Sequence, residues 1–404
     1  MTGRHVELLI VGGGLAGGTL ALAAASAGIE TALVDRAPPA ALLAEAYDGR
    51  TTALAWGSQQ VFAALGLWRD LAPDAEPMRE IRVADGGSRL FLHYDHALAG
   101  DHPLGFMVEN RVLRRALIAR SAALPSLVHL APVAVERVDY GAGAATATLS
   151  DGSSVRASLV AAADGKTSPL RAAAKIRTVE WSYPQTAIVC TVRHAEPHRG
   201  VAVEHFLPAG PFAILPMTGN RSSIVWTERA ALVPSLLALD DDAFQAELAR
   251  RFGDYLGAVA VEGPRRSYPL SFLFAAHTTA PRLALVGEAA HLIHPIAGQG
   301  FNLAIRDIAA LTEAIVDARR LGLDIGGADV LRRYAASRQL DAALLGAVTD
   351  GLNRLFSNDA APVRLARDLG LAAVDRMTPL KRIFMRHAMG TLGPLPRLAR
   401  GERL

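Results

Sequence analysis

The chain has 404 residues, of which 51% are hydrophobic and 20% charged, and this composition excludes a disordered or collagen-like protein. Its single cysteine, Cys190, excludes an internal disulfide and a Cys-x-x-Cys redox pair and indicates a reducing compartment. The formal net charge is +3, and residues 365–404 carry eight Lys and Arg against three Asp and Glu, so the basicity is confined to the tail and no nucleic-acid partner is expected.

An apolar segment, Leu8 to Ile29, has the length of a membrane span, but glycines interrupt its front half. They follow the strand-like Val6 to Val11 as Gly12-x-Gly14-x-x-Gly17. The first glycine of such a unit permits a tight turn, the second lets the backbone approach a pyrophosphate, and the third lets helix and strand pack closely. The segment therefore predicts a dinucleotide-binding turn, with no signal peptide and no transmembrane span.

A helix is expected from Thr19 to Ala27, with Gly28 as its stop and a second strand over Thr31 to Val34. That strand ends in Asp35, 23 residues after Gly12. This is close to the offset at which a carboxylate accepts hydrogen bonds from an adenosine ribose.

Two further strand-to-turn units follow. The first ends at Asp164-Gly165, with Ser168 and Pro169 as the N-cap and first-turn proline of a helix that contains Arg171. The second ends at Glu288 and leads through Gly298-Gln299-Gly300 into a helix expected over Phe301 to Arg319. The glycines let a ligand approach the backbone N–H groups that are free at a helix start, where the helix dipole carries partial positive charge.

Strand-like runs dominate between Arg177 and Phe274 and predict a second domain built on a sheet. Asp151-Gly152 predicts a hairpin, and Gly87-Ser88 a second turn. The aromatic residues of this region either wall a pocket for a hydrophobic ring or belong to its core: Trp181, Tyr183, Phe206, Phe212 and Trp226.

His291 and His294 lie three residues apart beside Glu288, but Pro295 and the glycines predict a turn without a third ligand, so no metal site is expected. His294 is interpreted either as a substrate-side residue or as a structural turn histidine bonded to backbone, and His291 as a packing residue. No Gly-x-Ser-x-Gly element is present, which argues against a hydrolase.

The tail from Ala361 onward predicts short helices in which Leu380, Ile383 and Phe384 stand beside Lys381 and Arg382. Basic and apolar residues together favour a membrane surface or a partner protein. A solvated helix packed on the dinucleotide-binding domain is the alternative.

At these motifs the chain resembles the FAD-dependent aromatic hydroxylases of the para-hydroxybenzoate hydroxylase fold, and within them the ubiquinone-biosynthesis hydroxylases. The resemblance spans nearly the whole chain and is most specific over His294 to Asp307. It also includes the segments from Asp48 to Leu54, Val108 to Leu113, Tyr183 to Val189 and Gly210 to Pro216. Glu288 stands where the wider family has Asp, and Ala304 where it usually has glycine.

The resemblance implies a fold of class α/β: a Rossmann-like FAD-binding domain, a mostly antiparallel β-sheet substrate domain and a C-terminal helical tail. We expect the FAD-binding domain over residues 1–75, 101–175 and 275–330, the sheet domain over 76–100 and 176–274, and the helical region over 331–404. The residues expected to bind the cofactor are Gly12, Gly14, Leu15, Ala16, Gly17, Asp35, Arg36, Arg50, Asn110, Asp164, Glu288, Gly298, Gly300, Phe301 and Asn302.

The implied function is hydroxylation of the aromatic ring of a polyprenylated phenol in ubiquinone biosynthesis. It uses FAD, O2 and electrons from NADH or NADPH, with a flavin hydroperoxide as the oxygen donor, so no catalytic side chain is assigned. We expect a cytoplasmic enzyme, peripheral on the inner membrane, in contact with other ubiquinone-biosynthesis proteins. The alternatives are a prenyl reductase or epoxidase of the same fold, and an inactive flavin-fold scaffold of a lipid-biosynthesis complex.

Overall fold

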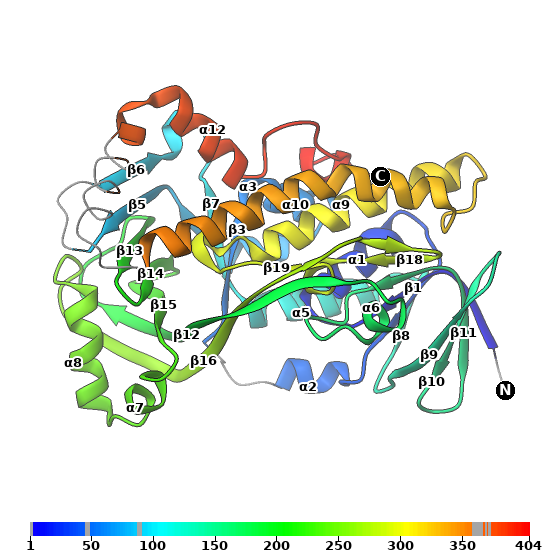
Figure 1. Ribbon diagram of the computed structural model, residues 1–404, viewed down its shortest axis with the longest axis horizontal. Coiled ribbons are helices and arrows are strands. Elements are labelled where there is room, and N and C mark those ends of the chain that lie inside the picture. The colour runs from blue at the N-terminus through cyan, green and yellow to red at the C-terminus, as the bar shows by residue number, and fades with distance from the viewer. Residues whose placement is uncertain (1–2, 45–48, 87–90, 358–366, 368–369, 371–372) are drawn as a thin grey trace.

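The computed structural model describes residues 3–44, 49–86, 91–357, 367, 370 and 373–404. Asp48, Gly87, Ser88 and the start of the predicted tail helices at Ala361 therefore lie outside the described residues. The described part forms two eight-stranded sheets and one three-stranded sheet. The two large sheets follow one another along the long axis of the molecule, the first toward the right and the second toward the left in Figure 1.

The first large sheet contains the predicted strand–turn–helix–strand unit. Its central strand β1 (Gly3–Val11) pairs in parallel with β2 (Thr31–Val34) and with β11 (Ser154–Ala162). The other strands are β8 (Leu127–Leu130), β9 (Val135–Tyr140), β10 (Ala145–Leu149), β17 (Thr279–Ala280) and β18 (Leu283–Leu285). The hairpin predicted at Asp151-Gly152 joins β10 to β11, and Gly152 adopts φ +81° there.

Helices cover one face of this sheet because the turn after each parallel strand sends the chain back across it. They are α1 (Leu15–Ser26), α3 (Trp56–Ala64), α5 (Asn110–Ala122) and α9 (Gln299–Arg320). The apolar core between the helices and the sheet includes Leu8 and Ile10 of β1, Leu159 of β11 and Ile308 of α9. Short helices complete the region: α2 (Pro39–Ala44), α4 (Trp68–Leu71) and α6 (Pro169–Ala173).

The second large sheet is antiparallel except for the parallel pair β5 and β13. Its strands are β5 (Glu80–Asp85), β6 (Phe91–Asp95), β12 (Thr178–His194), β13 (Val201–Leu207), β14 (Gly210–Met217), β15 (Arg221–Arg229), β16 (Val259–Ala275) and β19 (His291–Leu292). Helix α8 (Asp241–Phe252) packs on one face and α7 (Val233–Leu237) lies beside it. The small sheet consists of β3 (Thr51–Ala55), β4 (Glu76–Met78) and β7 (Gly105–Glu109).

The C-terminal region is helical, as predicted. Helix α10 (Ala328–Phe356) runs along the molecule and contacts β17 of the first sheet and β14 of the second (Figure 1). Helix α12 (Thr378–Ala388) follows, and the last turn, η5 (Arg397–Arg400), inserts Leu398 into the core of the first sheet. In the described ranges no helix has the length and apolar character needed to cross a membrane.

Candidate functional site

The three predicted turns meet at one edge of the first sheet, because β2, β1, β11 and β18 are neighbouring parallel strands and their carboxyl ends point the same way. The register pairs Val11 with both Val34 and Ala162. Gly12, Asp35 and Asp164 therefore follow adjacent strand ends. A sheet edge of this kind is where α/β proteins bind dinucleotides.

The glycines of the first turn differ in what surrounds them. A Cβ on Gly12, which has φ +104°, would lie 2.3 Å from the Ala163 carbonyl oxygen, and a Cβ on Gly17 would lie 1.8 Å from the Gly12 oxygen. Both glycines are required by close backbone packing. A Cβ on Gly14 would have no protein atom within 4 Å, although Gly14 is the N-cap of α1.

Helix α1 presents backbone N–H groups at this open position. Gly14 supplies no side-chain cap, and the first turn of α1 contains no acidic residue. Free N–H groups and the helix dipole suit a phosphate. Leu15 and Ala16 belong to this first turn and pack partly against the core.

Asp35 is held in place by two backbone groups. Its Oδ2 accepts the Gly13 N–H and its Oδ1 accepts the Ala37 N–H at 2.6 Å. A carboxylate offers about four acceptor positions, so two bonds leave capacity for ribose hydroxyls. The side chain of the next residue, Arg36, is exposed.

Asp164 carries a buried oxygen without a partner. Its Oδ2 accepts the Leu170 N–H at 3.3 Å, whereas Oδ1 has no hydrogen-bond partner among the described residues. Burial raises the pKa of this carboxyl group. An unsatisfied buried acceptor beside the Gly12 turn is the feature that a hydroxyl-bearing ligand would complete.

The predicted cap of α6 is confirmed, since Ser168 Oγ accepts the Arg171 N–H at 3.0 Å and Pro169 begins the helix. The buried Arg171 side chain had no predicted role. It donates to the Lys166 carbonyl at 2.7 Å and to the Ala289 carbonyl at 2.9 Å, and so ties the second turn to the third.

The third turn does not place Glu288 at the strand end itself. Strand β18 ends at Leu285, and Glu288 lies within a 3-10 turn, η3 (Gly287–Ala289), with its side chain exposed. Gly287 has φ +62°, which lets the chain reverse direction there.

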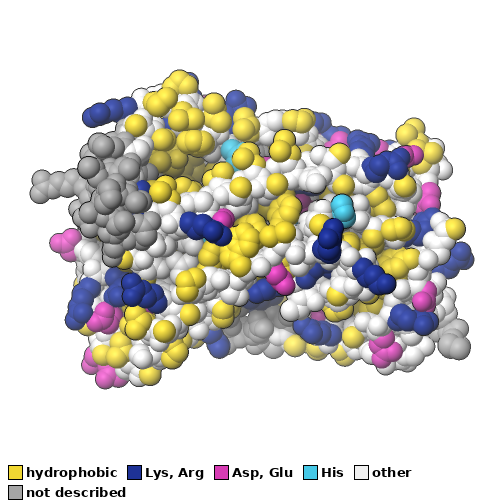
Figure 2. Space-filling view, in the orientation of Figure 1, with side chains coloured by type: hydrophobic (Ala, Val, Ile, Leu, Met, Phe, Trp, Pro, Cys, Tyr) yellow, Lys and Arg dark blue, Asp and Glu magenta, His cyan; other side chains and the backbone are white. Residues whose placement is uncertain are grey.

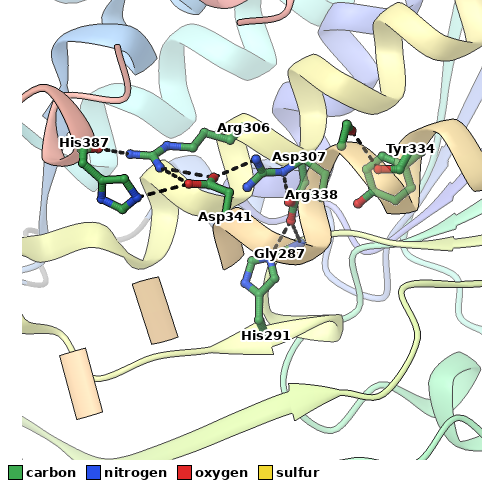
Figure 3. Close-up of polar contacts among 9 residues, drawn as sticks. Gly287, His291, Arg306, Asp307, Tyr334, Arg338, Asp341 and His387 are labelled. Carbon is green, nitrogen blue, oxygen red and sulfur yellow. Dashed lines mark hydrogen bonds and ion pairs between the residues drawn. The ribbon is translucent and has the colours of Figure 1, made fainter. Parts of the chain in front are cut away.

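A buried ionic network contacts this turn through Gly287 (Figure 3). Asp307 of α9 accepts the Gly287 N–H at 3.1 Å, His291 Nε2 lies 2.6 Å from its Oδ2, and Arg338 of α10 donates to its Oδ1 at 2.8 Å. Burial alone would raise the pKa of Asp307, but His291 and Arg338 outweigh it and hold the pKa below its usual value. His291 is thus an ion-pair partner in addition to a packing residue.

The network continues to the C-terminal helices. Arg338 also pairs with Asp341 at 2.8 Å, and Arg306 donates to Asp341 at 3.0 Å and to the His387 carbonyl at 2.8 Å. Helices α9, α10 and α12 therefore share one chain of charge-assisted hydrogen bonds (Figure 3). The sequence offered no signal for it beyond the acid and arginine spacing on α9 and α10.

The start of α9 resembles the start of α1. Gly298, with φ +62°, is its N-cap and approaches Ala53 of β3 so closely that a Cβ would lie 2.9 Å from the Ala53 Cβ. A Cβ on Gly300 would meet no protein atom within 4 Å. The first turn of α9 therefore combines an open glycine with N–H groups that have no partner within the helix itself.

Asn302 is buried and Phe301 half-buried, whereas Gly300 is exposed. The Asn302 amide donates to the Ala53 carbonyl at 2.8 Å and its oxygen accepts the Ala55 N–H and the Ser58 hydroxyl, each at 2.8 Å. Asn302 therefore fastens α9 to β3. Phe301 packs partly against the core, 6.5 Å from the Phe62 ring.

Arg50 and Asn110 occupy the side of the site formed by the small sheet. The exposed Arg50 guanidinium lies over the Tyr268 ring of β16 at 5.3 Å. The buried Asn110 side chain accepts a hydrogen bond from the Thr52 hydroxyl at 2.6 Å, and the Asn110 backbone N–H donates to the Arg50 carbonyl at 3.0 Å. Arg50 thus spans the gap between the small sheet and the antiparallel sheet.

His294 does not hydrogen-bond to backbone, contrary to one of the two interpretations. It is fully buried, its ring packs edge-on against Tyr183 at 5.1 Å, and neither ring nitrogen has a partner in the described part of the chain. Burial lowers the pKa of His294 to about 4, so the ring is neutral at pH 7. The described residues contain no group of His, Cys, Asp or Glu able to hold a metal ion.

Two of the five aromatic residues cannot wall a pocket. Phe212 and Trp226 are fully buried on the face of the antiparallel sheet that packs against Phe244 of α8. Trp181 stacks on Phe272 at 4.1 Å, and Phe206 stacks on Phe356 of α10 at the same distance. A pocket function for Phe212 and Trp226 was therefore the wrong interpretation, because strand alternation directs both side chains into the core.

The residues fit FAD. Two helix starts with open glycines can receive a pyrophosphate and an electron-rich ring, and Asp35 and the unpartnered Asp164 oxygen can accept hydroxyl groups. Together with the parallel sheet, these features define a dinucleotide-binding flavoprotein. A family model described as an FAD binding domain matches residues 5–344.

Sequence relatives identify the family of flavoproteins to which the chain belongs. The chain is 56% identical to ubiquinone hydroxylase UbiL of Rhodospirillum rubrum over 99% of its own length and 94% of that protein's length. It is 34% identical to the 3-demethoxyubiquinol 3-hydroxylase of Escherichia coli, over 96% and 100% of the two chains. The chain belongs to the FAD-dependent ubiquinone-biosynthesis hydroxylases.

Solved structures show the same fold. The p-nitrophenol 4-monooxygenase PnpA of Pseudomonas putida superimposes with a TM-score of 0.79 at 19% identity, covering 96% of this chain and 100% of PnpA. The structure of pqsL of Pseudomonas aeruginosa, described as a probable FAD-dependent monooxygenase, gives a TM-score of 0.76 at 22% identity, covering 91% of this chain and 100% of pqsL. The predicted fold class, the FAD cofactor and the monooxygenase class are confirmed.

Proposed function

We propose that this chain hydroxylates the aromatic ring of a polyprenylated phenol intermediate of ubiquinone biosynthesis, with O2 as the oxygen source and NADH or NADPH as the electron source. The identity of 56% to a ubiquinone hydroxylase over nearly the full length of both chains carries this proposal. Bound FAD would supply the oxygen-activating chemistry.

The protein's own contribution is to bind and orient. We assign the pyrophosphate to the N–H groups at Gly14, Leu15 and Ala16, beside Gly12 and Gly17. Asp35 is assigned to the adenosine ribose, with Arg36 beside it. Asp164 and Glu288 are assigned to hydroxyl or phosphate oxygens between the two ends of the cofactor.

The isoalloxazine ring is assigned to the start of α9, at Gly298 and Gly300, with Phe301 and Asn302 holding that helix against β3. Arg50 and Asn110 form the opposite side. The partial positive charge of the α9 start stabilises a ring that becomes negative on reduction. We keep His294 as a substrate-side candidate, since it is a buried neutral imidazole whose two ring nitrogens have no partner among the residues that the structure describes.

The substrate is soluble in lipid, so we further propose that the enzyme works in the cytoplasm, peripherally on the inner membrane and beside other ubiquinone-biosynthesis proteins.

The cofactor assignment is tested with Gly14→Val and, as a control in the same helix, Gly18→Ala. A Cβ on Gly18 would lie 3.8 Å from the nearest protein atom, so both positions accept a Cβ, but only Gly14 is open and faces the assigned phosphates. We expect Gly14→Val to fold, by circular dichroism, and to purify without FAD. A Gly14→Val protein that retains a full flavin spectrum would refute the assignment.

The reaction is tested with the FAD-loaded protein, a short-chain prenylphenol, NADH or NADPH, and isotopically labelled O2. Ring hydroxylation adds one labelled oxygen atom to the ring. A product that gains two hydrogen atoms would identify a prenyl reductase, and oxygen on the prenyl chain would identify an epoxidase. An FAD-loaded protein that transforms no prenylphenol would favour the scaffold.

A further inference from the structure

The outward side of α10 changes character halfway along the helix. Its first half exposes charged residues, among them Asp329, Arg332 and Arg333. From Gln339 to Leu355 the only exposed charged residue is Arg354. Surface helices ordinarily expose charged and polar residues to solvent. The second half of α10 instead exposes mostly apolar residues, as a helix does on a side that is covered by another molecule.

The exposed apolar side chains of this half follow helical spacing. Leu340, Leu344, Val348 and Leu355 have exposed fractions of 79, 50, 45 and 44%. Residues four apart lie on one side of a helix, so the first three form a continuous stripe. A contiguous apolar surface of this kind marks an interaction site.

Helix α12 and its flanks present a second apolar group on the same face of the molecule. Met377, Ile383, Phe384 and Leu392 are each between 43 and 53% exposed. Figure 2 shows apolar side chains gathered over α12 and over the middle of α10. The Asp341–His387 contact at 3.4 Å and the Arg306 bridge hold the two helices together.

Among the described residues of α12 and of α10 from Gln339 onward, the free charge is positive. Their acids are engaged: Asp341 in the buried network, Asp350 with Tyr183 and Arg354, and Asp375, just before α12, with Lys381. The exposed arginines around α12 have no acidic partner among the described residues: Arg376, Arg382 and Arg386.

A cleft beside α12 is lined by positively charged side chains as well. It has a volume of about 330 Å³ and is lined by Leu98, Ala99, His102, Arg382, Arg386 and Thr391, with no acidic residue. Two arginines and a hydroxyl in a shallow cleft suit a phosphate headgroup.

We propose that this α10–α12 face docks on an anionic phospholipid bilayer. The exposed leucines, Ile383 and Phe384 would enter the interface between headgroups and acyl chains, while the α12 arginines bind lipid phosphates. A second copy of the chain fits less well, because a two-fold contact sets the same surface against itself, and the described residues of α12 and of the second half of α10 include no free acid to meet the arginines. The inference rests on the proposed function, in which the substrate resides in the bilayer.

The test uses the FAD-loaded full chain and vesicles of phosphatidylcholine, with or without phosphatidylglycerol, separated by flotation. We expect binding to the anionic vesicles that weakens with salt and in pure phosphatidylcholine. Leu344→Glu combined with Val348→Glu should reduce partitioning at least about tenfold, because two apolar contacts are lost and two negative charges are added. Arg382→Gln combined with Arg386→Gln should reduce it about twenty-five-fold, at about fivefold for each arginine.

The matched control is Leu321→Glu, which changes a leucine that is 74% exposed at the turn after α9, outside the face. It should float like the wild type. Absence of vesicle binding by the wild type, or equal binding by all variants, would overturn the proposal. So would light scattering that shows a wild-type dimer dissociated by Leu344→Glu, since the face would then join two copies.

Hydroxylation of a water-soluble short-chain prenylphenol separates this proposal from the previous one. The docking variants should retain wild-type FAD content and turnover on that substrate. If no protein turns it over, the proposed function fails while flotation still measures docking. If all turn it over and none floats, only the docking proposal fails.

Discussion

Asp307 is the residue on which the third turn of the site depends. It is fully buried, and its carboxylate hydrogen-bonds to the Gly287 N–H, the His291 ring and the Arg338 guanidinium. Removing one member of a buried ion pair costs about 3–5 kcal/mol, because the remaining charge stays desolvated. Arg338 keeps a second partner, Asp341, at 2.8 Å, so we expect Asp307→Asn to lose about 3 kcal/mol of unfolding free energy.

The matched control is Asp317→Asn on the same helix. Asp317 also pairs with two arginines, Arg333 and Arg397, but all three side chains are partly exposed. Exposed ion pairs contribute under about 1 kcal/mol, so this change should be nearly silent. Urea unfolding of both variants, with and without FAD, measures the difference. Equal losses in the two variants would refute the argument from burial.

The pH dependence gives an independent check. The pKa of Asp307 is lowered in the folded state, so the unfolded state binds more protons in acid. The stabilisation from Asp307 is therefore present above the ordinary carboxyl pKa of about 4 and is lost as the pH falls below it. The difference in unfolding free energy between wild type and Asp307→Asn should stay constant from about pH 7 to pH 5 and shrink below about pH 4. A difference that grows in acid would contradict the assignment.

Three further predictions follow from buried groups. The pKa of His294 is lowered to about 4 in the folded protein, whereas the unfolded chain binds this proton below about pH 6.5, so the wild type should lose about 3 kcal/mol of unfolding free energy between pH 6.5 and pH 4 from this group alone. His294→Gln should abolish that loss, whereas the exposed His277→Gln should not. Identical pH profiles of unfolding free energy for wild type and His294→Gln would refute this prediction. Gly17→Ala should prevent folding of the apoprotein because its Cβ would overlap a backbone oxygen, while Gly18→Ala should leave the melting temperature within a few degrees. Leu398→Ala should cost about 2–5 kcal/mol in urea unfolding, because the side chain is 1% exposed in the core of the first sheet, and an unchanged midpoint would show that the C-terminal turn is not part of that core.

The local backbone units were predictable from the sequence because neighbouring residues alone specify them. The second strand, Thr31–Val34, has the predicted bounds, and Ser168 and Pro169 begin α6 as expected. The helix after Gly14 starts four residues earlier than predicted, at Leu15, because the glycine turn itself supplies the cap. A strand, a cap or a hairpin depends on side-chain spacing and on turn chemistry, which are visible in one chain segment.

Contacts between distant segments were decided only by tertiary structure. His291 acquires an ion-pair partner because α9 brings Asp307 against it, and Arg171 reaches the Ala289 carbonyl 118 residues away. The basic and apolar residues of the tail were recognised from the sequence. That α10 exposes an apolar side next to them was visible only in the folded chain. Local preferences fix which residues form a strand, a turn or a helix, whereas the partner of a buried charge and the exposed side of a helix depend on which segments pack together, and that packing is set by the whole core.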